Sequence, residues 1–129
     1  MTVLKADVEN IFGESNVQKW SQMDNDSKFA DDHRITLGIT YGRDLVNAKF
    51  RMSTYAVPMV ETGLVTDWIA TLAGIWLWRP RGIRDDTEGT RMMGFSEQVN
   101  REMDFTLAGM MNLAGQTRTS GHPTAPVGS

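Results

Sequence analysis

The longest apolar run of the chain is WIATLAGIWLW, residues 68–78, and it decides the fold class. As a helix this run would be about 16 Å long, roughly half the thickness of a bilayer core. It is therefore too short for a membrane span and predicts a buried core helix. That helix is expected from about Leu64 to Arg79, because Pro80 ends it. Its predicted buried face consists of Val65, Trp68, Ile69, Leu72, Ile75 and Trp76.

Helical spacing of apolar residues also marks the sequence before this run. A short helix is predicted at residues 4–12, with Gly13 as its C-cap, and a second helical turn at residues 17–20. Residues 23–29 are expected to form a polar loop. A long helix should begin at Asp31 or Asp32, because acidic side chains favour the positive end of the helix dipole, and should reach about Ser53.

This long helix has two neighbouring apolar faces. One consists of Leu37, Tyr41, Leu45, Ala48 and Met52, and the other of Ile35, Ile39, Val46 and Phe50. A stripe that wide predicts a central helix that is contacted from two sides.

The last helix is predicted from Thr87 or Glu88 to about Leu113, with Gly115 as its stop. Its apolar stripe consists of Met92, Phe95, Val99, Met103, Thr106, Met110 and Leu113. Residues 116–129 are rich in glycine, proline, threonine and serine, and this composition does not fold alone. The sequence thus predicts an all-α protein, with a compact bundle of about four helices at residues 1–115 and an extended C-terminal tail at residues 116–129.

Five glycines fall inside the predicted helices: Gly38, Gly42, Gly74, Gly94 and Gly109. Each costs about 1 kcal/mol relative to alanine in a helix interior. One interpretation is that they allow helices to approach closely, within the fold or between subunits. The other is that some of them are turns and that the helices are shorter.

Composition excludes several classes of function. The chain has 129 residues, no cysteine, and a net charge of −3 from 13 basic and 16 acidic side chains. Disulfides, cysteine-ligated zinc and thiol nucleophiles are thereby excluded, and folding inside a cell is expected. The charge is too mixed for a protein that binds free nucleic acid. The first residues do not form a signal-peptide pattern.

Residues that could carry chemistry are few. His33 and His122 belong to no catalytic or metal-binding motif, and an EF-hand loop that began at Asp24 would place Lys28 and Phe29 at its fifth and sixth positions. We therefore predict no enzyme, no metal and no cofactor. A small basic cluster, Arg79, Arg81 and Arg84, is followed at once by Asp85 and Asp86. It could face DNA phosphates or an acidic neighbour, or it could be a solvated loop.

The order of these segments resembles the head-tail connector (head-completion adaptor) proteins of tailed phages, in particular the Mu-like group. The residues that carry the resemblance are Ile11-Phe12-Gly13-Glu14, the segment from Trp20 to Asp26, Asp31-Asp32, Tyr55-Ala56-Val57-Pro58, Trp76-Leu77-Trp78-Arg79, Asp85-Asp86 and Leu113-Ala114-Gly115. The match covers about residues 3–115. Two features differ: no glycine follows the acids of the aspartate loop, and the long helix lacks the usual run of small residues.

The resemblance implies a virion structural protein that is assembled in the host cytoplasm and located in the neck between head and tail. Its subunits would form a twelve-membered ring under the portal protein, continue the channel for double-stranded DNA without sequence specificity, and receive the stopper or tail-completion protein. No membrane is involved. The loop with Arg79, Arg81, Arg84, Asp85 and Asp86 is the candidate for the channel or the tail-facing side.

The C-terminal tail is the candidate docking segment for the portal or a neighbouring subunit. The residues named for this role are Gln116, Thr117, Arg118, Thr119, His122, Pro123, Pro126 and Val127. The alternative function is a small helical regulator or assembly chaperone that acts as a monomer or dimer. A DNA-binding regulator is disfavoured, because acidic residues outnumber basic ones in the last helix.

Overall fold

The computed structural model describes residues 2–22, 31–81 and 86–118. Within these ranges the protein is all-helical and has no strand. The helices are α1 (Lys5–Phe12), α2 (Glu14–Ser21), α3 (Asp32–Phe50), α4 (Leu64–Trp78) and α5 (Asp86–Leu107), and a short 3-10 helix, η1 (Arg79–Arg81), follows α4. The predicted fold class is confirmed. The predicted polar loop at residues 23–29 lies outside the described residues.

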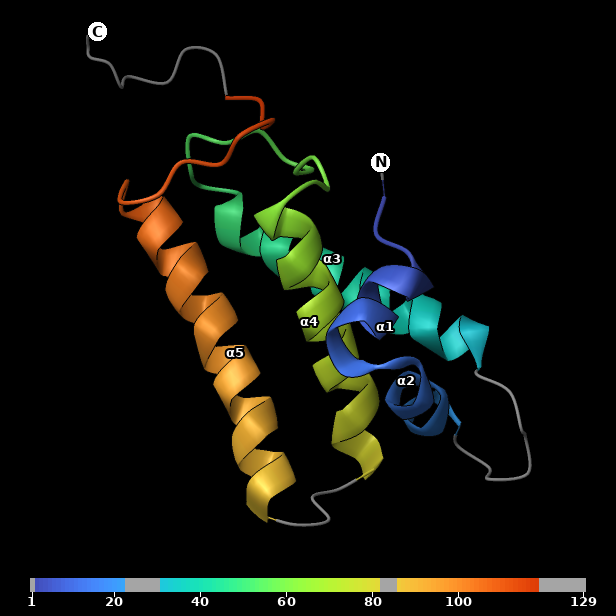
Figure 1. Ribbon diagram of the computed structural model, residues 1–129. Coiled ribbons are helices and arrows are strands. Elements are labelled where there is room, and N and C mark those ends of the chain that lie inside the picture. Colours follow the sequence, from blue (N-terminus) through green and yellow to red (C-terminus); the bar gives the residue numbers. More distant parts are fainter. Residues whose placement is uncertain (1, 23–30, 82–85, 119–129) are drawn as a thin grey trace, which may run out of the picture.

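The central helix is α4, and the prediction that the long helix α3 is central was wrong. In Figure 1, α3 lies behind α4, α5 lies along one side of it, and α1 and α2 pack near its other side. Of the 15 residues of α4, 11 are buried. The apolar run is the cause: a helix that is apolar all round must be covered all round. None of the described helices is both long and apolar enough to cross a membrane.

The N-terminal helices form as predicted. The backbone N–H of Leu4 donates to the carboxylate of Asp7 over 2.8 Å, which satisfies a free donor at the start of α1. Gly13, with φ +92°, ends α1 by donating to the carbonyl of Glu9 over 2.7 Å, and α2 begins directly after it. At the start of α3 the side chain of Asp31 accepts the N–H of Arg34 over 3.1 Å, an N-cap of the usual kind.

Glycines let α3 and α4 approach closely. A Cβ at Gly42 would lie 2.6 Å from the carbonyl oxygen of Ile69, and one at Gly38 would lie 3.2 Å from the carbonyl oxygen of Ala73. The distance at Gly42 leaves no room for a Cβ unless the backbone shifts, and the one at Gly38 is tighter than an ordinary van der Waals contact, so both glycines serve close helix packing. Of the two faces predicted on α3, one is buried at all of its residues, which are Ile35, Ile39, Val46 and Phe50.

The last helix is shorter than predicted, because it ends at Leu107 and not near Leu113. Gly109 adopts φ +82°, its N–H donates to the carbonyl of Thr106 over 3.1 Å, and the N–H of Met110 donates to Phe105 over 2.9 Å. These two bonds are those of a Schellman C-cap, in which glycine takes the left-handed position. The stop is therefore Gly109, and Gly115 lies in the irregular segment that follows.

Candidate docking surfaces

The C-terminal segment folds back onto the linker between α3 and α4, which comprises residues 51–63 and contains a cis peptide bond before Pro58. The N–H of Ala56 donates to the carbonyl of Thr117 over 2.7 Å. The side-chain amide of Gln116 pairs with the backbone of Val60, accepting over 2.9 Å and donating over 2.6 Å. In Figure 1 the end of the coloured chain crosses this linker.

Arg118 fixes the end of that segment. Its guanidinium carbon lies 4.0 Å from the centre of the Tyr55 ring, and its Nη2 donates to Tyr55 Oη over 3.1 Å and to Asn112 Oδ1 over 3.2 Å. Arg118 also contacts the hydroxyl of Thr54. Tyr55 is buried, and its hydroxyl accepts the N–H of Leu113 over 3.2 Å. One buried tyrosine thus anchors both ends of residues 113–118.

Three of the predicted docking residues, Gln116, Thr117 and Arg118, are therefore engaged within their own chain. The sequence pattern predicts only a contact with a partner for these residues and does not indicate this internal role. The other predicted docking residues, Thr119, His122, Pro123, Pro126 and Val127, lie outside the described residues.

The N-terminal segment is tied to the same linker by Glu61. Its Oε1 accepts the N–H of Val3 over 2.7 Å and Arg43 Nη2 over 3.0 Å, and Arg43 Nε donates to Oε2 over 2.5 Å. Burial pushes the pKa of Glu61 up, but the hydrogen bonds from Arg43, Val3 and Thr2 outweigh it, so the net pKa lies below the ordinary value. No sequence motif pointed to this carboxylate.

The predicted channel-facing loop is described in part. Arg79 is exposed in η1, and η1 ends at Arg81. Asp86 begins α5, while Arg84 and Asp85 lie outside the described residues. The described backbone thus places the two ends of this loop at the C-terminal end of η1 and at the N-terminal end of α5.

Apolar residues remain exposed along α3. Leu37 is 43% exposed and Leu45 is 40% exposed, and Ala48 is exposed on the same stripe. Tyr41, between the two leucines, is half-buried with its ring centre 6.3 Å from that of Trp76. We call Leu37, Tyr41, Leu45 and Ala48 the α3 stripe. It is the part of the other predicted face that lies within α3; Met52, the last residue of that face, follows the end of α3 and is 93% exposed. No other helix described here covers the two leucines fully.

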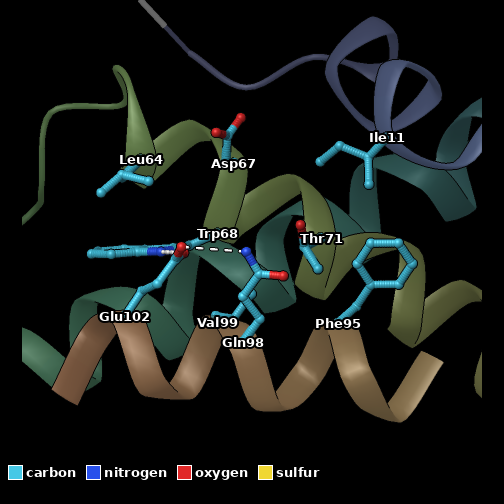
Figure 2. A pocket seen from close by; sticks show the side chains of 9 residues that line it. All are labelled: Ile11, Leu64, Asp67, Trp68, Thr71, Phe95, Gln98, Val99 and Glu102. Carbon is cyan, nitrogen blue, oxygen red and sulfur yellow. Dashed lines mark hydrogen bonds between the residues drawn. The ribbon is translucent and has the colours of Figure 1, made fainter. Parts of the chain in front are cut away.

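A pocket of about 240 Å³ lies where α4, α5 and α1 meet. We call it the α4–α5 pocket. Its lining residues are Ile11, Leu64, Asp67, Trp68, Thr71, Phe95, Gln98, Val99 and Glu102 (Figure 2). Five of these nine residues are apolar, and the polar ones are Thr71, Gln98 and two carboxylates.

These two carboxylates come from different helices, Asp67 from α4 and Glu102 from α5. Glu102 Oε1 accepts the indole N–H of Trp68 over 2.9 Å, and Oε2 accepts Gln98 Nε2 over 3.4 Å. Burial raises the pKa of Asp67, and the charges of Glu102 and Asp7 raise it further. No sequence pattern predicts this pocket, because Asp67 and Glu102 are 35 positions apart in the sequence and only the packing of α4 on α5 brings them together.

The described residues hold no cluster of three histidine or acidic side chains that could bind a metal. His33, near the start of α3, is exposed. No family model, no curated protein and no solved structure matches the chain.

Proposed function

We propose that the chain is a head-to-tail connector subunit of a tailed phage, which forms a ring under the portal, extends the DNA channel and receives the stopper or tail. The α3 stripe carries this proposal. Apolar side chains left exposed in a row on one helix are typical of a surface that another protein covers. A stripe on one side of a subunit, facing a different surface on the next, gives head-to-tail contacts, which close into a ring when the rotation between neighbouring subunits divides a full turn evenly.

The anchoring of residues 113–118 supports the same function. Tyr55 and Arg118 fix the point from which the remaining residues of the tail start. A fixed starting point lowers the entropy that a docking segment loses when it binds a partner. Residues 119–129 are then the part of the tail that reaches the portal or a neighbouring subunit.

The test is to mix the purified chain with its portal protein and to examine the mixture by negative-stain electron microscopy and light scattering. We expect rings seated on the portal. Leu45→Glu should abolish ring formation and leave the helical content unchanged, because Leu45 is 40% exposed. Leu107→Glu is the matched control, since Leu107 is also 40% exposed but lies at the end of α5. The proposal would be contradicted if the chain did not bind the portal, or if both variants lost ring formation to the same extent.

A small helical regulator or assembly chaperone is the second candidate. The α3 stripe would then join two copies in a free dimer. Light scattering without the portal separates the two: a stable dimer that Leu45→Glu dissociates favours the regulator, and a monomer that assembles only on the portal favours the connector.

A further inference from the structure

We propose that the α4–α5 pocket receives a basic side chain, arginine or lysine, that a partner protein presents. This inference is independent of the connector proposal, because it rests on the pocket alone. It names the chemistry of one contact and not the assembly in which the contact is made.

The size and the walls of the pocket fit one long side chain. Its volume of about 240 Å³ lies below the range of about 300–1,000 Å³ in which drug-sized ligands bind. Ile11, Leu64, Phe95 and Val99 supply apolar wall. Arginine and lysine have long aliphatic stems that pack on such walls while the charged end stays near polar groups.

The charge of the pocket selects the occupant. Among the ion pairs of the described chain none includes Asp67 or Glu102. The two donors that Glu102 accepts, from Trp68 and Gln98, are neutral, so they leave its negative charge uncompensated. Figure 2 shows both carboxylates at the pocket, one from each helix. A cation bound between them would lower the repulsion that also raises the pKa of Asp67.

Two other occupants fit less well. A metal ion would need more ligands than two carboxylates, and no described cluster of three such groups exists. The second occupant would be Arg91 of α5. Its guanidinium carbon lies 5.8 Å from the centre of the Phe95 ring, and it forms no ion pair with Asp67 or Glu102. A guanidinium of this chain thus already lies within cation–π distance of the Phe95 ring.

The experiment uses the full chain and N-acetyl-arginine amide as the probe, with N-acetyl-citrulline amide as a neutral probe of nearly the same shape. The readout is the indole N–H resonance of Trp68, because this proton is bonded to Glu102 in the pocket. We expect a saturable shift with the arginine probe and almost none with the citrulline probe. The double variant Asp67→Asn/Glu102→Gln should weaken binding about tenfold.

Glu97→Gln is the matched control, because it removes one acidic charge from the exposed side of α5 without touching the pocket. It should change the affinity less than about twofold. Glu102→Gln keeps an oxygen that can accept the Trp68 N–H, so the fold should survive, and Asp67→Asn alone provides a milder second variant. Equal shifts with both probes, equal loss with Glu97→Gln, or no shift at all would overturn the inference. Self-association that depends on Asp67 and Glu102 would make a second copy the source of the basic side chain and would overturn the assignment to a different partner protein.

Discussion

The ring of Phe12 lies directly against the backbone of Gly74. A Cβ built at position 74 would be 2.1 Å from Cε2 of Phe12, and the same ring meets Phe95 edge-on, with 5.2 Å between the ring centres. A residue of α1 therefore reaches across α4 to α5 through a gap that only glycine leaves open. Three helices share this one contact.

Gly74→Ala should destabilise the protein by about 1–3 kcal/mol, because the new methyl group displaces a buried aromatic ring. Urea unfolding measures this as a lower midpoint at an unchanged slope. Gly94→Ala is the control: a Cβ there meets nothing within 4 Å, so the better helix propensity of alanine should stabilise α5 by up to about 1 kcal/mol. A neutral Gly74→Ala variant would show that Phe12 is not held as described.

Glu61→Gln should lower stability at neutral pH by about 1–2 kcal/mol, because it removes a charge that Arg43 and Val3 bind. The pKa of Glu61 is lowered in the folded state, so its contribution is fully present above the unfolded value of about 4.5 and is lost as pH falls through the folded pKa. Thermal unfolding from pH 7 to pH 3 should therefore show the two proteins converging at acidic pH. A difference that stays constant with pH would contradict this assignment.

Asp67→Asn should change the stability at neutral pH in the opposite direction from Glu61→Gln. The pKa of Asp67 is raised in the folded state, so its ionised form destabilises the fold above the folded pKa, and this penalty disappears below the unfolded value of about 3.8. The substitution should stabilise the chain slightly at pH 7, by less than about 1 kcal/mol because the carboxylate is largely exposed. Thermal unfolding at pH 7 and pH 3 measures it, and a loss of stability at pH 7 would refute it.

Arg118→Ala should release residues 113–118 from the linker without unfolding the helices, because its contacts are confined to Tyr55, Asn112 and Thr54. Amide hydrogen exchange should become faster at Leu113 and Ala56, whose N–H groups depend on this arrangement. Arg118→Lys should give an intermediate effect, since an ammonium keeps the charge but not the planar fork. Unchanged exchange in both variants would mean that the bonds of Gln116 to Val60, Thr117 to Ala56 and Leu113 to Tyr55 hold the segment without Arg118.

The sequence predicted the helices well where the chain gives a local signal. The start of α3 is marked by Asp31, the end of α1 by Gly13, and α4 by its own apolar run. The end of α5 was misplaced because Met110 and Leu113 continue the helical spacing, while the decisive residue, Gly109, also fitted a helix interior. In the structure Met110 is 72% exposed, so its helical spacing from Met103 and Thr106 does not mean that it belongs to a buried face.

Contacts between residues far apart in the sequence could not be predicted from the sequence pattern. The contact of Arg118 with Tyr55 joins residues 63 positions apart, and nothing in either neighbourhood indicates the other. Likewise, the sequence around Asp67 does not indicate Glu102, and the sequence of α3 does not indicate that this helix packs on α4. Which apolar face of α3 is covered, and which helix is central, depends on the global packing and not on the periodicity of a single helix.

Both ends of the described chain are tied to the linker between α3 and α4. Glu61 holds Val3, while Tyr55 and Val60 hold residues 113–118. Tension applied to the chain after residue 118 would thus be borne first by the side chains of Arg118 and Gln116. It would pass into the span between α3 and α4, so that α5 would not unravel from its last turn until these tethers had failed.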